Sequence, residues 1–257
     1  MNTFQSKGKV VLLSAGPGDL ELLTVKAVKA LAEAHVLLLD DLVNPEIVTL
    51  APAAKVIHVG KRGGCRSTSQ AFICRLMRRY ARQGLCVARI KGGEALMFGR
   101  AGEEIAFLRK HGVEVQILNG ISSALAAAAA LGASLTHRDH CHGVTFVTAH
   151  TRDGEEPDWA TLAAGGTTLA IYMGMSRLES LTAGLLRHLP GTTPAAVVQW
   201  VSRSNERQLL TTLDRLAQEA CAAGLGSPAI LLIGTAMREA ITSRTAAISP
   251  MTQLRAG

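Results

Sequence analysis

Side chains that could do chemistry gather where predicted strands end in glycine turns. In residues 85–104, L-C-V-A-R-I-K-G-G-E-A-L-M-F-G-R-A-G-E-E, a short apolar strand stops at Gly92 and Gly93 and a helix follows. Glycines at the carboxyl end of a strand let a ligand contact peptide N–H and C=O groups directly. Arg100 and Glu103 stand three residues apart at the helix start and are predicted to form a polar pair facing the same edge. The stretch predicts a binding site, although a glycine pair alone could be a simple turn.

Two other groups of polar residues follow predicted strands. Asp40 and Asp41 come directly after the apolar run 35–39, and Ser122 and Ser123 begin an alanine-rich helix. Asp40 could act on a substrate proton, or one carboxylate could cap the following turn while the other is solvated. The serine hydroxyls and free amides could hold a carboxylate or a ribose oxygen, and N-capping would explain them equally well. The residues alone leave these alternatives open.

Hydrophobic periodicity predicts the elements that must position these residues. Apolar runs alternate with helical patterns through the first half, with strands over 9–15, 35–39, 55–59, 85–90, 113–118 and 143–149 and helices over 21–34, 67–82, 101–111 and 123–131. The first helix is expected to open with Asp19 near its cap. Carboxyl ends of parallel strands share one edge of a sheet, so Gly16, Asp40 and Gly92 are expected at the same edge.

The second half is also predicted to be α/β. The turn-rich, charged segment 151–166 is interpreted as a linker, which gives an N-terminal domain over 1–150 and a C-terminal domain over 151–257. Strands are predicted over 167–172, 195–201 and 227–233, with helices over 176–188 and 213–223.

Charge and composition restrict the partners. The chain has 257 residues, 48% hydrophobic content and a formal charge of +7, but its basic residues are mixed with acidic ones and it has two Trp, two Tyr and five Phe. Nucleic acid is therefore not expected. A small polyanionic substrate would explain the arginines, as would a solvated face. The same two interpretations apply to the basic stretch K-R-G-G-C-R at 61–66.

Other classes of site and location are disfavoured. Five cysteines without a C-x-x-C pair argue against a disulfide framework and a structural zinc site, and adjacent residues such as His140, Cys141 and His142 rarely converge on one ion. No metal is predicted. The turn G-P-G-D at 16–19 lacks the G-x-G-x-x-G spacing of a dinucleotide site. No segment approaches the length needed to span a bilayer, so we expect no membrane partner and a cytoplasmic location.

Taken together, the glycine turns, their order and their spacing resemble the tetrapyrrole methyltransferases that use S-adenosylmethionine, and among them the enzymes that C-methylate uroporphyrinogen III. The resemblance runs from about residue 8 to 234. It is carried by S-A-G-P-G-D at 14–19, L-D-D-L-V at 39–43, V-G-K-R at 59–62, K-G-G-E at 91–94, F-G-R-A-G-E-E at 98–104, T-H-R-D at 136–139, V-T-F-V-T-A-H at 144–150, I-Y-M-G at 171–174 and S-P-A at 227–229.

The resemblance implies a fold, a cofactor and a set of site residues. The fold would be the two-domain tetrapyrrole methyltransferase fold, each domain a mostly parallel or mixed sheet flanked by helices, with the cofactor in the interdomain cleft and two chains in a homodimer. S-adenosylmethionine would be the methyl donor and S-adenosylhomocysteine the product. The cofactor would contact Pro17, Gly92, Gly93, Glu94, Ser122, Ser123, Met173, Val201 and Ala229. Binding or catalysis of the acidic macrocycle would involve Asp40, Arg100, Glu103 and Arg138.

The implied reaction is transfer of two methyl groups to uroporphyrinogen III, giving precorrin-2 through precorrin-1, for sirohaem, cobalamin or haem d1. A methyltransferase of a later precorrin and a catalytically impaired tetrapyrrole-binding homologue are the alternatives. Three motifs depart from the family pattern: G-A-G-P begins with Ser14, G-G-D-P ends in Glu94 and Ala95, and P-G-I-T begins with Asn119 and ends in Ser122. Loss of the proline at 95 is expected to loosen the turn and weaken cofactor affinity.

Overall fold

The chain divides into two compact units, residues 1–123 and 124–257. A computed structural model describes residues 8–60, 68–139, 141–150, 154–238 and 240. The basic stretch at 61–66 lies outside the described residues. In the described part of the chain, no helix is long and apolar enough to cross a membrane.

The first unit is built on a five-stranded parallel sheet with the strand order β3-β2-β4-β1-β5. Nearly continuous apolar runs form its central strands, as expected for strands covered on both faces. The strands are β1 (Lys9–Ser14), β2 (Val36–Leu39), β3 (Lys55–His58), β4 (Val87–Lys91) and β5 (Glu114–Leu118). The helices are α1 (Val25–Ala32), α2 (Gln70–Arg82) and α3 (Ala101–Lys110), with short 3-10 turns η1 (Leu20–Leu22) and η2 (Pro45–Leu50).

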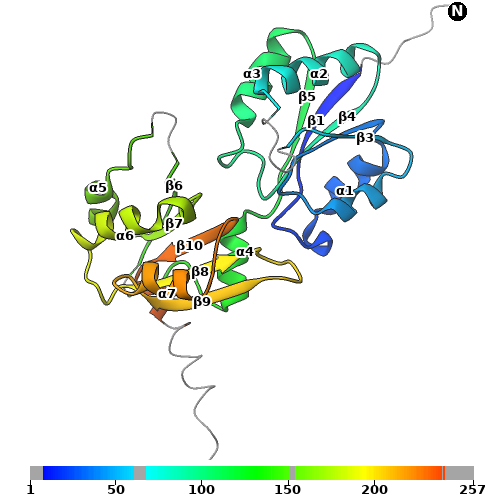
Figure 1. Cartoon of the computed structure of the whole chain (residues 1–257). Coiled ribbons are helices and arrows are strands. Elements are labelled where there is room, and N and C mark those ends of the chain that lie inside the picture. Colours follow the sequence, from blue (N-terminus) through cyan, green and yellow to red (C-terminus); the bar gives the residue numbers. More distant parts are fainter. Residues whose placement is uncertain (1–7, 61–67, 140, 151–153, 239, 241–257) are drawn as a thin grey trace, which may run out of the picture. The chain divides into compact units, whose positions relative to one another are not determined.

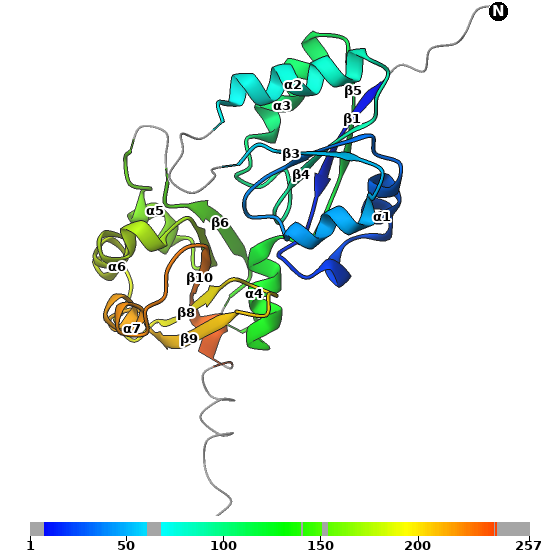
Figure 2. The same ribbon diagram turned by 45° about the vertical axis from the view of Figure 1, so that its right-hand side comes forward.

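The alternation of side chains along β4 sorts them between the two covering layers. Ala88 and Ile90 pack in the cluster that contains α1, whereas Val87 packs in the cluster that contains α2 and α3. Figures 1 and 2 show α1 on one face of this sheet and α2 and α3 on the other. Since side chains alternate along a strand, Arg89 and Lys91 also lie on the face of α2 and α3.

The carboxyl edge of this sheet has a switch point between two neighbouring strands. β1 and β4 are adjacent and parallel, but the chain leaves β1 for α1 on one face and β4 for α3 on the other. Ligands of open α/β sheets bind at such points. Gly16, Asp40 and Gly92 follow β1, β2 and β4 at this edge, which confirms the predicted placement.

The second unit contains a mixed five-stranded sheet with the order β6-β7-β10-β8-β9. β6 and β7 are parallel, and β10 runs antiparallel to β7 and β8. The strands are β6 (Val144–Thr148), β7 (Thr168–Tyr172), β8 (Pro194–Gln199), β9 (Arg207–Thr212) and β10 (Ala229–Ile233). The other elements are α4 (Ser123–Leu131), α5 (Trp159–Ala164), α6 (Leu178–Leu186), α7 (Leu216–Ala222) and the 3-10 turns η3 (Met175–Arg177) and η4 (Thr235–Met237).

Helices α5, α6 and α7 cover one face of the second sheet and α4 lies on the other (Figure 2). Two sheets flanked by helices, one parallel and one mixed, confirm the predicted α/β class. β6 pairs with β7, so the second sheet starts before the domain boundary expected near residue 150. The division of contacts after Ser123 falls earlier still, and the boundary near 150 stays a prediction.

Three local predictions differ from the structure. Asp19 caps the 3-10 turn η1, and the α-helix starts later because the Thr24 hydroxyl accepts a hydrogen bond from Ala27 N at 3.1 Å. Helix α5 occupies part of the segment interpreted as a linker, where buried Trp159 joins the core. Strand β9 was not predicted. It is an edge strand whose residues are mostly half-buried, so its hydrophobic signal is weak.

Two helical glycines form a matched pair for testing the packing. We expect Gly184→Ala to lower the free energy of unfolding by about 1–3 kcal/mol, because the added Cβ would lie 2.5 Å from Cδ1 of Trp159. Gly102→Ala is the control, since nothing lies within 4 Å of its added Cβ, and it should be stabilising by up to about 1 kcal/mol. Urea unfolding of both variants measures the difference, and equal effects would contradict the packing of α6 on α5.

Candidate functional site

Two glycine turns meet at the switch point of the first sheet. Gly16 N donates to Gly93 O at 3.1 Å, and Gly93 N donates to Gly16 O at 2.7 Å. Ala15 N donates to Lys91 O at 2.8 Å, which continues the β1–β4 ladder up to the turns. Gly93 has a φ of +65°, and a Cβ there would lie 3.2 Å from Ser123 Oγ. At this edge the backbones of Gly16 and Gly93 are therefore hydrogen-bonded to each other, and neither residue has a side chain.

The loop after β5 closes against the same turn. A Cβ on Gly120 would lie 2.6 Å from Ser14 Cβ, which excludes any side chain there. The Glu94 carboxylate joins this loop to the loop after β4, because its Oε2 accepts from Gly120 N at 2.8 Å and its Oε1 accepts from Leu96 N at 3.1 Å. The longer side chain at the family's usual Asp position thus bridges two backbone segments.

Ser14 and Ala95, two departures from the family pattern, are hydrogen-bonded to each other. Ala95 N donates to Ser14 Oγ at 2.9 Å, and both residues are buried. A proline at 95 has no N–H to donate, and a glycine at 14 has no hydroxyl to accept it. The turn therefore has a hydrogen bond that the usual motif lacks, while the expected weaker cofactor affinity stays a prediction.

The other predicted cofactor residues of the first unit lie in these loops. Pro17 follows Gly16, and Gly18 O accepts a hydrogen bond from Asn44 Nδ2 at 2.9 Å. Ser122 is buried and Ser123 begins α4. The structure brings six of the predicted residues to one sheet edge, namely Pro17, Gly92, Gly93, Glu94, Ser122 and Ser123. Their contacts with a cofactor stay a prediction.

Asp40 lies at this edge with its side chain 36% exposed. Its Oδ2 accepts from Arg89 Nη2 at 2.8 Å, and its Oδ1 accepts from Asp41 N at 3.2 Å. The carboxylate of Asp41 lies against Gly60, where an added Cβ would come 2.1 Å from Oδ1. Asp40 is thus a carboxylate oriented by a buried arginine and partly open to solvent.

Arg100 and Glu103 form the predicted polar pair. Arg100 Nε donates to Glu103 Oε1 at 2.8 Å and Nη2 donates to Oε2 at 2.7 Å, a two-point contact. Hydrogen bonding to Glu103 raises the pKa of the Arg100 guanidinium above its ordinary value. Both side chains are more than half exposed, so the pair adds little stability and can exchange partners with a ligand carboxylate.

The remaining predicted residues belong to the second unit. Ala229, which begins β10, pairs with Gln199 at the end of β8, and Val201 follows two residues later. β10 also runs antiparallel to β7, which puts Met173 at the same sheet edge as Ala229. Met173, Val201 and Ala229 therefore lie at one edge of the second sheet. Arg138 is exposed in a short turn closed by the His137–Cys141 bridge, and its relation to the first unit stays a prediction.

Comparisons with known proteins identify the family. The family model for the Tetrapyrrole (Corrin/Porphyrin) Methylases matches residues 9–217. The chain belongs to this family. Uroporphyrinogen-III C-methyltransferase of Pseudomonas aeruginosa is 50% identical over 236 residues, which cover 91% of this chain and 96% of that protein.

Solved tetrapyrrole methylase structures agree. Uroporphyrin-III C-methyl transferase from Thermus thermophilus, complexed with S-adenosylhomocysteine, is 37% identical and has a TM-score of 0.79 over 90% of this chain and 100% of that one. A cobalt precorrin-4 methyltransferase is 28% identical, with a TM-score of 0.82 over 92% of this chain and 99% of that one.

The edges of both sheets of this methylase fit an adenosyl cofactor. At the first, Gly92 and Gly93 carry no side chains, so a ligand can contact their peptide groups directly. At the second, Gln199 is 8% exposed, and within the described residues its Oε1 has no hydrogen-bond partner. A buried acceptor of this kind suits a ligand N–H such as an adenine amino group. The second edge thus offers a buried polar atom that the described residues leave without a hydrogen-bond partner.

Sequence reasoning about this methylase missed three buried charged residues, Arg89, Lys91 and Glu104. Arg89 Nε donates to Glu104 Oε1 at 3.2 Å, and Lys91 Nζ lies 3.4 Å from Glu104 Oε2. A signal was present, because two basic residues alternate at the end of an otherwise apolar strand. Such residues need buried counter-charges, which the sequence does not locate.

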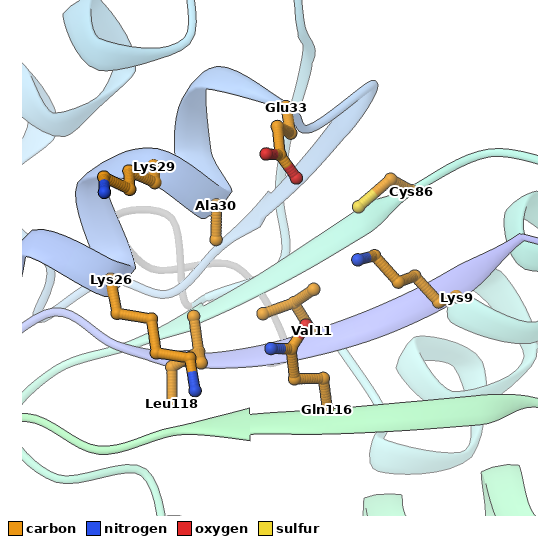
Figure 3. A pocket seen from close by; sticks show the side chains of 9 residues that line it. All are labelled: Lys9, Val11, Lys26, Lys29, Ala30, Glu33, Cys86, Gln116 and Leu118. Carbon is orange, nitrogen blue, oxygen red and sulfur yellow. The ribbon is translucent and has the colours of Figure 1, made fainter.

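Two other features of the methylase lie apart from these edges. A pocket of about 170 Å³ is lined by Lys9, Lys26 and Gln116 among others, and no predicted site residue lines it (Figure 3). Cys141 Sγ lies 3.1 Å from Thr168 Oγ1, and His140 lies outside the described residues. Among the residues that are described, no three His, Cys, Asp or Glu side chains form a group that could hold a metal ion.

Stability measurements can test the Ser14–Ala95 pair. Ser14→Ala should lower the free energy of unfolding by about 1–3 kcal/mol, because it leaves the buried Ala95 N–H without an acceptor. Adding Ala95→Pro should recover part of that loss, since proline has no N–H to leave unpaired. Urea denaturation of the two single variants and the double variant measures the coupling, and strictly additive losses would contradict it.

Proposed function

We propose that this chain catalyses S-adenosylmethionine-dependent C-methylation of uroporphyrinogen III to precorrin-2 through precorrin-1. One observation carries the proposal: in a chain of this family, Asp40 and the bare backbone of Gly92 and Gly93 lie at one sheet edge, and the loop after Gly93 leads to the Arg100–Glu103 pair at the start of α3. Relatives of 50% and 40% identity that bear the name uroporphyrinogen-III C-methyltransferase support this substrate over a later precorrin.

The residues at this edge, together with Arg138 of the second unit, suit an amphiphilic, acidic macrocycle. Arg100 and Arg138 would hold acetate and propionate groups, for which planar guanidinium groups offer two-point geometry. Leu42, Leu96 and Phe98 are exposed apolar side chains that would contact the flat hydrocarbon surface. Leu42 also packs beside Gly92, because a Cβ on that glycine would lie 3.3 Å from Leu42 Cβ.

The protein's chemical contribution would be alignment and charge stabilisation. The sulfonium cofactor supplies an activated methyl group, so the reaction needs no nucleophile from the protein. Asp40 would accept hydrogen bonds from pyrrole N–H groups, stabilise the cationic macrocycle and accept the proton that is lost. Its partial exposure leaves room for that contact while Arg89 holds it. Glu103 would orient Arg100 until a substrate carboxylate replaces it.

The proposed cofactor contacts in the second unit are Met173, Val201 and Ala229, supported by their common place at one sheet edge. A homodimer and a cytoplasmic location complete the proposal. Both rest on the sequence.

The first test is a product measurement. Purified protein is incubated without oxygen with S-adenosylmethionine and enzymatically generated uroporphyrinogen III, and the tetrapyrrole product is analysed by mass spectrometry. Two added methyl groups are expected. No added methyl group, with cofactor still bound in equilibrium dialysis, would favour a later precorrin as the substrate, and absence of cofactor binding would favour an impaired homologue.

Arginine variants test the roles in substrate binding. Arg100→Ala and Arg138→Ala should each lower kcat/KM for uroporphyrinogen III by about 100-fold or more, because each removes a charged partner of a substrate carboxylate. The dissociation constant of S-adenosylhomocysteine, measured by calorimetry, should stay within about twofold. Arg109→Ala, an exposed arginine at the far end of α3, is the matched control and should behave as wild type. Loss of cofactor binding in both variants would reassign the arginines to the cofactor site.

A further inference from the structure

Four charged side chains form a chain of ion pairs that runs from the interior of the first unit to its carboxyl edge. Arg89 Nη2 donates to Asp40 Oδ2 at 2.8 Å, Arg89 Nε donates to Glu104 Oε1 at 3.2 Å, and Lys91 Nζ lies 3.4 Å from Glu104 Oε2. The side chains of Arg89 and Glu104 are 3% and 0% exposed, whereas that of Asp40 is 36% exposed. The Glu104 end of this series of ion pairs is therefore buried, and the Asp40 end is open to a ligand.

The fold brings these residues together from three elements. Arg89 and Lys91 lie two positions apart on β4, on the face covered by α2 and α3, and Glu104 lies in the first turn of α3. Asp40 follows β2. Gln70 on α2 adds a neutral partner, since its Nε2 donates to Glu104 Oε1 at 2.9 Å. Burying charges is costly, and a buried ion network is weak evidence for stability. The network is therefore better explained by the group that it orients than by a contribution to stability.

Arg89 connects Glu104 to Asp40, because its guanidinium contacts both carboxylates. Besides its two carboxylate partners, its Nη1 donates to Ile90 O at 3.2 Å and lies 3.5 Å from Leu38 O. The planar guanidinium is thus fixed on several sides, and its Nη2 points at Asp40 in one direction. Asp40 also accepts a hydrogen bond from the neighbouring Asp41 N. The orientation of the Asp40 carboxylate consequently depends on Arg89.

The same network supports the loop that carries Arg100. Phe98 and Arg100 have φ values of +51° and +56°, and a Cβ on Gly99 between them would lie 2.9 Å from Lys91 Cε. The loop thus rests on the Lys91 side chain. Burial, and then the charge of Arg89, lower the pKa of Lys91, while Glu104 acts in the opposite direction. Without the Glu104 charge, Arg89 would keep its ion pair with Asp40, whereas Lys91 would lose the carboxylate that it contacts.

We propose that Glu104 is a positioning residue for methyl transfer: it holds Arg89, and through Arg89 it orients Asp40 toward the macrocycle. This inference rests on the proposed function. It assigns Glu104 no contact with substrate or cofactor, because its side chain is fully buried.

A double-mutant cycle tests the route through Asp40. Glu104→Gln should lower kcat about 10- to 100-fold and leave the dissociation constant of S-adenosylhomocysteine within about twofold. If Glu104 acts through Asp40, the double variant with Asp40→Asn will be no slower than Asp40→Asn alone. Arg89→Lys should be about as slow as Glu104→Gln, because one ammonium cannot occupy both nitrogen positions of the guanidinium. If the losses of kcat from Glu104→Gln and Asp40→Asn multiply in the double variant, the proposal is overturned. It is also overturned if Arg89→Lys keeps wild-type kcat.

Two further measurements are needed. One separates a positioning role from a loss of stability, and the other separates failure of this inference from failure of the proposed function. Thr182→Val is the matched control, since it removes one buried hydrogen bond, Thr182 Oγ1 to Leu178 O, from the second unit and should keep wild-type kcat. Fluorescence titration with uroporphyrin III, the unreactive oxidised macrocycle, should show equal weakening by Asp40→Asn and Glu104→Gln. If Glu104→Gln binds uroporphyrin III as tightly as wild type does, the positioning role is overturned. Wild-type protein that leaves uroporphyrinogen III unmodified overturns the proposed function itself.

Discussion

The two hydrogen bonds between Gly16 and Gly93 are the constraint on which the candidate site depends. They join the turns after β1 and β4 at the point where the chain leaves for opposite faces of the sheet. Both residues adopt left-handed backbone conformations, with φ values of +70° at Gly16 and +65° at Gly93, which glycine adopts without strain. Ser14, Glu94 and Gly120 then close around this contact through hydrogen bonds and tight packing.

The two arginines near this edge illustrate how burial decides the role of a charge. Arg100 is exposed and paired with an exposed carboxylate, so water competes with the pair and a ligand carboxylate can replace Glu103. Arg89 is buried among fixed acceptors, so its geometry is set and exchange would leave a charge without a partner. The first suits binding of an arriving anion, and the second suits orientation of a neighbouring group.

Departures from the family motifs are coupled in space. Ser14 and Ala95 stand 81 positions apart, yet the serine hydroxyl accepts the amide hydrogen that a proline would lack. Glu94 uses its additional methylene to reach the amide of Gly120. Taken alone, the loss of proline at 95 suggested a loosened turn. Hydrogen bonding at both positions instead ties the turn to β1 and to the loop after β5.

The sequence by itself determined the α/β class, the parallel strands of the first unit, the glycine turns and the Arg100–Glu103 pair, because each follows from local periodicity or from neighbours within one helical turn. It did not reveal β9, whose edge position weakens the hydrophobic pattern. It also did not reveal the helix start at Thr24, because Asp19, a few residues earlier, is an equally good capping residue. Only the tertiary structure decided which carboxylates meet the two basic residues of β4. Asp40 and Glu104 come from elements far apart in the chain, and their approach to Arg89 depends on how α3 packs on the sheet and β2 pairs with β4.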